Sequence, residues 1–160
     1  MMMKNATEQP TLGWREWVTL PELGIETIKA KIDTGARTSA LHAYYLEPYN
    51  KAGEKWVRFD VHPFQKQIDI SCECHAKVVD YRKVTDSGGH IEYRYVIHTM
   101  ITLGEDSFIT ELTLTNRETM QFRMLLGRNT LKKRYVVDTG KSFMLKRKSK
   151  RKPKRANEVL

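Results

Sequence analysis

The sequence contains almost no cysteine and no long apolar run. Its two cysteines, Cys72 and Cys74, are separated by one residue. A disulfide between such close neighbours would be strained, so a disulfide-stapled secreted fold is not expected. No apolar run approaches the roughly 18 to 20 residues needed to span a bilayer, and the polar residues 1–10 lack the apolar centre of a secretory signal. We therefore expect a cytoplasmic protein that does not enter a membrane.

Metal and nucleotide motifs are also missing. The sequence has no His-Glu-x-x-His, no pair of Cys-x-x-Cys motifs and no Gly-x-x-x-x-Gly-Lys-Ser/Thr loop. Cys72, Cys74 and His75 lie close together, but in a strand His75 would point away from both thiols. A structural zinc would then need further ligands from His42, His62, His90 or His98. We expect two partly buried strand cysteines, no metal and no cofactor.

Negative charge is scarce at the C-terminal end. The net charge of the chain is +9, and eight of the ten residues 146–155 are Lys or Arg, opposed in the remaining tail only by Glu158. The tail therefore carries +7, which leaves +2 for residues 1–145. A block of like charges with a proline predicts a disordered basic tail over 146–160. It either serves as a solvated terminus or contacts RNA, the ribosome or an acidic protein, with an affinity that falls as salt rises.

Helical periodicity is scarce too, whereas alternation of apolar and polar residues is frequent. Ile28, Ala30 and Ile32 alternate with two lysines, which predicts a half-buried strand over 24–33. Further strands are expected at 39–49, 56–61, 75–85, 91–103, 108–115 and 134–138, with a glycine-containing hairpin turn at 86–90 and one short helix at 129–133. These elements predict an all-β fold, a small closed or partly open β-barrel over residues 12–145, preceded by a disordered segment 1–11.

One acidic motif directly follows the first long strand. Asp33-Thr34-Gly35 alone is a common turn tripeptide, but here it is accompanied by a second element, "MLLGRNTL" at 124–131. Gly35 lets the backbone turn tightly and approach a substrate, and the Thr34 hydroxyl can fix the loop. Gly127 leaves room for a crossing chain. The pair of elements makes Asp33 the candidate catalytic carboxylate.

This pair of elements resembles the retropepsin-like aspartic peptidases. The segments 17–43, 81–94 and 111–128 are similar to one branch, the RimK-associated family named as ATP-dependent zinc proteases, and the resemblance covers about four fifths of the chain. It implies an acid-protease barrel and a peptidase, that is, a hydrolase acting on acidic or glutamylated protein tails. It also implies association with a RimK-type glutamate ligase. The zinc and ATP of the family's name find no motif in this sequence.

An aspartic mechanism needs two carboxylates that share a proton. The chain offers one well-placed aspartate, so the mechanism predicts a homodimer in which Asp33 of each copy faces the other. A second tripeptide, Asp138-Thr139-Gly140, is followed by only about twenty residues, most of them in the basic tail. We expect a simple turn there, because no second crossing element remains to build another lobe.

Two arginines accompany the motif pair. Viral retropepsins carry an acid two residues after the Asp-Thr-Gly glycine, where this chain has Arg37, which would lie near Arg128. Like charges so close are unfavourable unless a carboxylate lies between them. Either an acidic substrate supplies it by bidentate contacts, or it comes from Glu92, Glu111 or Glu118. His42 is the third substrate-binding candidate, with a buried structural histidine as the alternative.

Two functions are therefore compared. The first is a peptidase whose glycine-tipped hairpin at Gly88-Gly89 forms a flap, although that hairpin can equally be an ordinary turn. The second is a non-catalytic binding or adaptor domain that holds acidic protein tails and sits on the ribosome through a basic, RNA-contacting arm. A dimer with two Asp33 carboxyls within hydrogen-bond distance would favour the first.

Overall fold

The computed structural model describes residues 9–64, 70–85, 88–116 and 121–145. The basic tail, Glu118 and most of the N-terminal segment predicted as disordered lie outside these ranges. Thr11, inside that N-terminal segment, belongs to strand β1 (Thr11–Leu12), which pairs in parallel with β12 (Val136–Val137). Among the described residues, no helix is long and apolar enough to cross a membrane.

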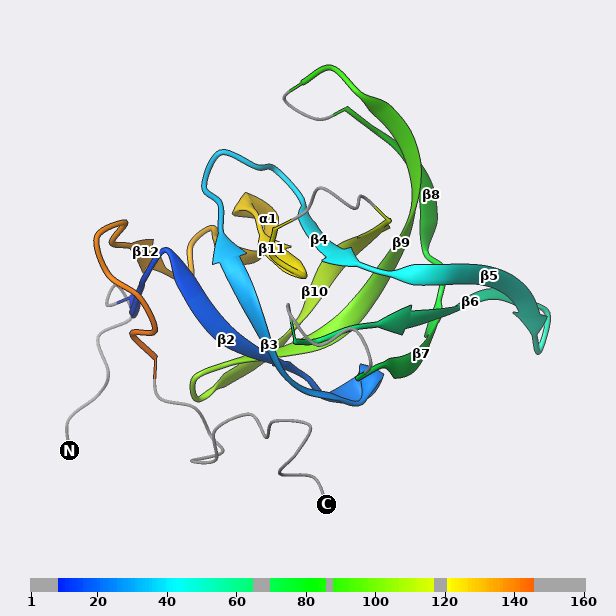
Figure 1. Cartoon of the computed structure of the whole chain (residues 1–160), viewed down its shortest axis with the longest axis horizontal. Coiled ribbons are helices and arrows are strands. Elements are labelled where there is room, and N and C mark those ends of the chain that lie inside the picture. The colour runs from blue at the N-terminus through cyan, green and yellow to red at the C-terminus, as the bar shows by residue number, and fades with distance from the viewer. Residues whose placement is uncertain (1–8, 65–69, 86–87, 117–120, 146–160) are drawn as a thin grey trace.

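Six strands close into a barrel, as the sequence predicted. They are β2 (Arg15–Leu20), β3 (Ile25–Ile32), β4 (Ser39–His42), β9 (Ile91–Leu103), β10 (Asp106–Thr115) and β11 (Met124–Leu126). Their order is β10-β4-β11-β3-β2-β9, and an additional pairing of β10 with β9 closes the ring. Strand β11 lies between β3, to which it is parallel, and β4, to which it is antiparallel. The short helix α1 (Arg128–Leu131) directly follows β11 and lies against β4 and β10 (Figure 1).

Alternating burial explains how the barrel is filled. In β3 the side chains of Ile28, Ala30 and Ile32 are buried, while Lys29 and Lys31 lie on the outer side. In β10 the side chains of Leu112 and Leu114 are likewise fully or nearly fully buried. Each fully buried aliphatic side chain contributes roughly 1.5–3 kcal/mol. The period-2 pattern of the sequence therefore identified the inward residues of these strands.

A three-stranded antiparallel sheet extends from the barrel. It consists of β5 (Tyr44–Lys51), β6 (Glu54–Val61) and β7 (Cys72–Lys77). The predicted single strand over 39–49 is interrupted after His42, where Tyr45 has φ of 55° and the register of β5 shifts. The change of direction at this point lets the chain pass from the barrel into the second sheet.

The prediction of one continuous strand over 75–85 was wrong. It divides into the end of β7 and β8 (Asp80–Thr85), which forms a hairpin with β9. At the division the N–H of Val78 donates to Lys55 O (2.9 Å), whereas the N–H of Val79 donates to Val96 O (2.8 Å). The chain thus changes hydrogen-bonding partner between two consecutive residues. Residues before the change belong to the three-stranded sheet, and residues after it pair with β9.

The return arm of the hairpin, β9, also changes its buried face. Arg94 and Val96 are buried, and then Ile97, Thr99 and Ile101 are buried instead. The predicted apolar face of Ile91, Tyr93, Tyr95 and Ile97 is therefore not continuous, since Ile91 and Tyr93 are exposed. The outer half of β9 belongs to a projecting hairpin, which curves away from the barrel in Figure 1.

The last described segment lies beside the first described strands. The predicted helix over 129–133 is found as α1, shifted by one or two residues, and the predicted strand over 134–138 is reduced to β12. Residues 141–145 return to the start of β2, where the N–H of Trp14 donates to Lys141 O (2.7 Å) and that of Phe143 donates to Arg15 O (3.0 Å). A 3-10 turn, η1 (Pro21–Leu23), joins β2 to β3.

Candidate functional site

Asp33 begins a tight loop at the end of β3. Its N–H donates to Leu126 O (2.9 Å), which attaches the loop to β11. Its carboxylate oxygen Oδ1 accepts the N–H of Gly35 (3.0 Å), and its carbonyl accepts the N–H of Ala36 (3.2 Å). Asp33 is half-buried, and Thr34 and Gly35 are exposed. The loop therefore fixes one carboxylate oxygen and presents the acid near the surface.

A second chain segment crosses directly against this loop. Gly127 is buried, and a Cβ at this position would lie 2.6 Å from Thr38 O and 2.9 Å from Ala36 O. The next two residues bind the loop backbone, because the N–H of Arg128 donates to Ala36 O (2.9 Å) and that of Asn129 donates to Arg37 O (3.0 Å). The structure thus brings the two sequence elements together, and only glycine fits at the crossing.

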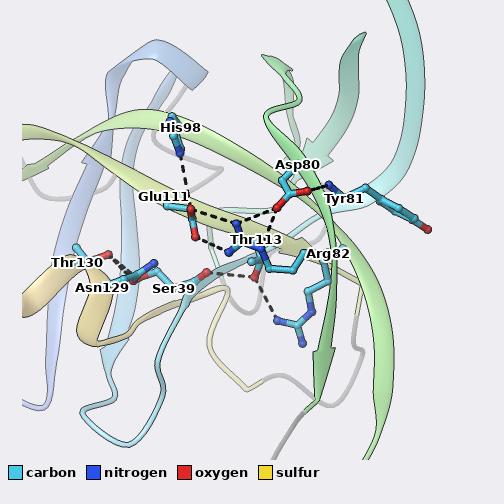
Figure 2. A network of polar contacts seen from close by, with 10 residues as sticks. Ser39, Asp80, Tyr81, Arg82, His98, Glu111, Thr113, Asn129 and Thr130 are labelled. Carbon is cyan, nitrogen blue, oxygen red and sulfur yellow. Dashed lines mark hydrogen bonds and ion pairs between the residues drawn. The ribbon is translucent and has the colours of Figure 1, made fainter.

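Ser39 connects the two segments from inside. Its fully buried hydroxyl accepts the N–H of Gly127 (3.0 Å) and lies 3.0 Å from Asn129 Oδ1, and it also contacts the Thr130 hydroxyl. The Thr113 hydroxyl donates to Ser39 O (3.1 Å). Figure 2 shows Ser39 between Asn129 and Thr130 on one side and Thr113 on the other. The sequence interpretation missed this role of Ser39.

Strand β9 of the β8–β9 hairpin is joined to the same network. Arg94 is 8% exposed, forms an ion pair with Glu92 and donates to the Thr113 hydroxyl (3.2 Å). Glu92 also accepts the Thr115 hydroxyl (2.7 Å). A buried ion pair needs such additional hydrogen bonds to offset its desolvation. Hydrogen bonds therefore lead from the hairpin through Thr113 and Ser39 to the crossing.

A more exposed ion-pair cluster lies at the outer side of the hairpin (Figure 2). Arg82 contacts Glu111 (2.7 Å) and Asp80 (3.0 Å). The pKa of Arg82 is raised, chiefly by its hydrogen bond with Glu111, and the pKa of Asp80 is lowered, first by the backbone N–H of Tyr81 and then by Arg82. His98 lies 3.7 Å from Glu111. Glu111 is thus bound by Arg82 of the hairpin and lies beside His98 of β9.

Arg37 and Arg128 are both exposed beside the Asp33 loop. Arg128 Nη1 donates to Thr34 O (3.0 Å), so this guanidinium also braces the loop. Of the three glutamates considered as internal partners, Glu92 binds Arg94 and Glu111 binds Arg82, while Glu118 lies outside the described residues. Neither Glu92 nor Glu111 supplies the carboxylate predicted between the two arginines.

His42 lies at the other end of β4 from Ser39 and is fully buried. Its Nδ1 is 3.2 Å from Arg123 Nη1, its ring centroid is 4.6 Å from that of Tyr44, and Arg123 also donates to the Tyr44 hydroxyl (2.7 Å). A ring with no exposed surface does not touch a ligand directly. Any part of His42 in substrate binding would therefore act through these neighbours.

The residues considered for zinc do not fit a metal site. Cys74 Sγ lies 3.3 Å from Leu23 O and Cys72 Sγ lies 3.5 Å from Gly24 O, both as thiol donors to backbone. Burial raises the pKa of the Cys74 thiol, which disfavours the thiolate that zinc binds. His75 is exposed and contacts the Tyr49 hydroxyl (2.8 Å). Within the described ranges, no three His, Cys, Asp or Glu side chains converge as ligands.

The second tripeptide forms the same local turn as the first. Asp138 Oδ1 accepts the N–H of Gly140 (3.0 Å), and Asp138 O accepts the N–H of Lys141 (3.2 Å). These two bonds have the same lengths as those of the Asp33 loop. A Cβ at Gly140 would meet only Asp138 Oδ1, at 3.4 Å. A glycine crosses the Asp138 loop too, because a Cβ at Gly13 would meet the backbone of Lys141 and Ser142. The N–H of Asp138 donates to Leu12 O (2.8 Å), and that of Trp14 donates to Lys141 O (2.7 Å). The expectation that no second crossing element remains was therefore wrong, since the N-terminal segment supplies one. What distinguishes the Asp33 loop is the Arg128-Asn129 pair, whose Asn129 N–H donates to Arg37 O and whose Arg128 side chain donates to Thr34 O.

Comparison with known proteins agrees with this arrangement. A family model described as "Retropepsin-like aspartic endopeptidase RimB" matches residues 11–148. The chain belongs to this RimB-like family. A protein of unknown function from Legionella pneumophila, whose crystal structure is known, superposes with a TM-score of 0.70 and 28% identity over 85% of this chain and 98% of that one. The retropepsin-like barrel expected from the sequence is thus confirmed.

Curated relatives of the RimB-like chain are much longer than it is. A protein of Shewanella halifaxensis named "Probable alpha-L-glutamate ligase" is 46% identical over 134 residues, which are 84% of this chain and 29% of that protein. A protein of the same name from Parasynechococcus marenigrum is 42% identical over 139 residues, 87% of this chain and 30% of that protein. The chain therefore spans less than a third of these relatives.

Proposed function

We propose that this protein is an aspartic endopeptidase that works as a homodimer, with Asp33 of each copy forming the catalytic pair. The observation that carries the proposal is the Asp33 loop held by the crossing segment at Gly127. Two carboxylates sharing one proton can activate water and hydrogen-bond the scissile carbonyl. In each copy the Gly35 N–H holds Oδ1, which orients Oδ2 toward its partner. The proposed reaction uses no metal ion and no nucleotide.

The proposed substrates are acidic or glutamylated protein tails in the cytoplasm. Arg37 and Arg128 are exposed beside the loop, and guanidinium groups bind carboxylates by paired hydrogen bonds. The ligase name of the longer relatives supports the same class, because a ligase that joins glutamate makes the bonds that this peptidase would break. We propose that the chain acts together with a RimK-type glutamate ligase.

The activity is tested with oligoglutamate-tailed peptides, using mass spectrometry to identify the products. Wild type and Asp138→Asn should cleave the peptides, and Asp33→Asn should be slower by at least about 100-fold, the lower range for loss of an acid–base group. Asp138 is the matched control, because it makes the same turn but is crossed by the Gly13 segment, which lacks the Arg128-Asn129 pair. Equal cleavage by wild type and Asp33→Asn would remove Asp33 from the mechanism.

The oligomeric state of the protein distinguishes the proposed peptidase from the alternative, a non-catalytic adaptor. The proposed catalytic pair takes one Asp33 from each of two copies, and the Asp138 loop, crossed by the Gly13 segment, is not part of that pair. A single copy would therefore favour the non-catalytic adaptor that only holds acidic tails. Sedimentation equilibrium over a concentration series should show a dimer, and cleavage rate per chain should rise with the dimer fraction. A monomer that binds oligoglutamate without cleaving it would support the adaptor.

A further inference from the structure

Strand β8 forms an open edge of the larger sheet. It comes last in the strand order, and within the described residues it pairs only with β9. The pairing runs from Asp80 to Thr85 without a shift of register. Figure 1 shows β8 as the outermost strand of the projecting hairpin. Its outer backbone N–H and C=O groups therefore form a regular template to which another strand can add.

The other sheet edges among the described strands are protected in ways that β8 is not. Strand β5 contains Pro48, which has no N–H to donate, and its register shifts after Tyr44. Strand β7 packs against η1 and β9, and β1 and β12 pair over only two residues each. Strand β8 contains neither a proline nor a bulge. Its remaining protection is the charge of its side chains, which disfavours some partners and favours others.

The outward side of this hairpin is aromatic. Residues paired in register share a face of the sheet, and on one face Tyr81 pairs with Tyr95 and Lys83 pairs with Tyr93. Tyr81 and Tyr93 stack with centroids 5.6 Å apart and planes at 22°, yet they remain 56% and 59% exposed. Figure 2 shows Tyr81 pointing away from the ion pairs of Arg82. We call this surface the outer hairpin face, and its residues are Tyr81, Lys83, Thr85, Ile91, Tyr93 and Tyr95.

Positive charge accompanies these rings, whereas the acids of the hairpin strands lie on the opposite side. Lys83 is exposed, and no ion pair within the described ranges includes it. Lys55 of β6 places its Nζ 5.9 Å from the Tyr95 ring centroid. Asp80 and Glu92 alternate onto the other face, where each forms an ion pair with an arginine. The outer hairpin face therefore presents cations without a matching acid among the described residues.

Charge disfavours a second copy of this chain as the added strand. Two copies of β8 related by a two-fold axis would pair antiparallel, with their outer hairpin faces on the same side of the joined sheet. The two such registers with the longest overlap would place Arg82 opposite Arg82, or Lys83 opposite Lys83. Like charges directly opposite each other are destabilising. The edge is therefore better suited to a different chain, one that brings a negative charge.

We propose that β8 binds an extended segment of another protein as an added antiparallel strand, with an acidic side chain opposite Lys83 and an apolar side chain opposite Tyr81. Backbone pairing with β8 would give affinity, and the alternate side chains would give specificity. The acid would neutralise Lys83, and the apolar residue would pack on the exposed tyrosine rings. Because Tyr81 and Lys83 are neighbours on one face, the segment carries one residue between its acid and its apolar residue. The proposal does not depend on peptidase activity.

The ligand class is tested by NMR titration of the isotope-labelled full chain, with affinities taken from the β8 amide signals. The probe is the blocked peptide Ser-Thr-Thr-Glu-Thr-Val-Thr-Ser. Its competitors are an oligoglutamate of equal length and Ser-Thr-Thr-Glu-Val-Thr-Thr-Ser, which places the acid and the valine on opposite faces. We expect the probe to bind at least about three-fold more tightly than either, the gain from one cross-strand pair. Equal or tighter binding of oligoglutamate would reduce the interaction to charge, and equal binding of the second competitor would remove the alternation. Both outcomes would overturn the proposal.

Strand addition is tested separately from charge by N-methylation of the probe. In an added strand only alternate N–H groups face β8. One version of the probe is methylated on the nitrogens of the glutamate, the valine and the residues in step with them, and the other on the nitrogens of the residues between. The two versions should differ in affinity at least about ten-fold, because only one of them loses its backbone hydrogen bonds to β8. Equal affinities would show that no strand is added.

Variants locate the site on the molecule. Lys83→Glu should weaken probe binding at least about three-fold, and it should bind a probe with lysine in place of glutamate more tightly than wild type does. A hairpin that had merely lost its structure would not give this rescue by the opposite charge. If neither peptide distinguishes Lys83→Glu from wild type, β8 is not the site.

A matched control separates the edge from the proposed active site. Arg37→Glu makes the same change of charge beside the Asp33 loop and should bind the original probe as wild type does. If Arg37→Glu weakens the probe as much as Lys83→Glu does, the effect is one of net charge and the proposal fails. Failure of binding at β8 would leave the proposed peptidase standing, and loss of cleavage in Asp33→Asn would leave the β8 site standing.

Discussion

Replacing Gly127 by alanine should weaken the junction that holds the Asp33 loop. The added Cβ would lie 2.6 Å from Thr38 O, 2.8 Å from Thr38 C and 2.9 Å from Ala36 O, all of them backbone atoms. Overpacking of this kind costs typically 1–3 kcal/mol. Moving the segment away would also weaken the two hydrogen bonds from Arg128 N and Asn129 N to the loop, each worth about 1 kcal/mol. We expect a loss of about 3 kcal/mol.

The assay is urea unfolding followed by circular dichroism. With a slope of about 2 kcal/mol per molar urea, typical of a small protein, the midpoint of Gly127→Ala should fall by about 1.5 M. Gly140→Ala is the matched control, because its Cβ would meet only Asp138 Oδ1 at 3.4 Å, an ordinary contact. If both variants unfold at the same urea concentration, the crossing is not tight and the proposed support of Asp33 is wrong.

Three further predictions concern the network, a buried phenol and the substrate. Ser39→Ala removes the buried acceptor of the Gly127 N–H and should lower the free energy of unfolding by about 1–3 kcal/mol, measured by urea unfolding; an unchanged midpoint would contradict the role of the hydroxyl. Burial raises the pKa of Tyr135 to about 12, so the folded state keeps a proton that the unfolded state loses near pH 10. Stability should therefore fall as pH rises from about 10 to 12, and a comparison of urea midpoints across this range should show a smaller fall in Tyr135→Phe. Arg37→Glu should raise the KM for oligoglutamate-tailed peptides about ten-fold or more through repulsion, with no change for neutral peptides; equal KM values would remove Arg37 from substrate binding.

Short-range pattern was sufficient for the elements that define the barrel. The alternation of Ile28, Ala30 and Ile32 with lysines predicted β3 and its inward face, because one side of that strand meets the core along its whole length. The same reasoning failed over 75–85. There the two adjacent valines, Val78 and Val79, interrupt the alternation at the point where the hydrogen-bonding partner changes from Lys55 to Val96. The interruption coincides with the break, but local alternation does not identify the new partner, which is distant in sequence.

Of the residues that hold the Asp33 loop in place, the sequence interpretation identified the glycine of the crossing segment but not the buried serine. Gly127 was recognised, since a crossing of backbones excludes a side chain. Ser39 was not, because a serine in a short strand has no distinctive local pattern. Its importance comes from Gly127 and Thr113, which are 88 and 74 residues away in the sequence. Only the folded chain brings these donors to one hydroxyl and its carbonyl.

Comparison of the two Asp-Thr-Gly loops shows which of their hydrogen bonds come from the tripeptide itself and which are specific to the Asp33 loop. Both aspartates accept the N–H of the glycine at 3.0 Å and form the same backbone turn at 3.2 Å, so the tripeptide alone produces these bonds wherever a loop permits them. They therefore carry no information about catalysis. Both loops are also bound by a crossing segment: the N–H of Asp33 donates to Leu126 O and that of Asp138 to Leu12 O, while Arg128 N and Trp14 N donate to the carbonyls of Ala36 and Lys141. The Asp33 loop differs in the further bond from Asn129 N to Arg37 O (3.0 Å) and in the Arg128 side chain that donates to Thr34 O. A retropepsin-like site in a new sequence is thus recognised by the Gly-Arg-Asn segment, because both the tripeptide and a crossing glycine also occur in the loop at 138–140.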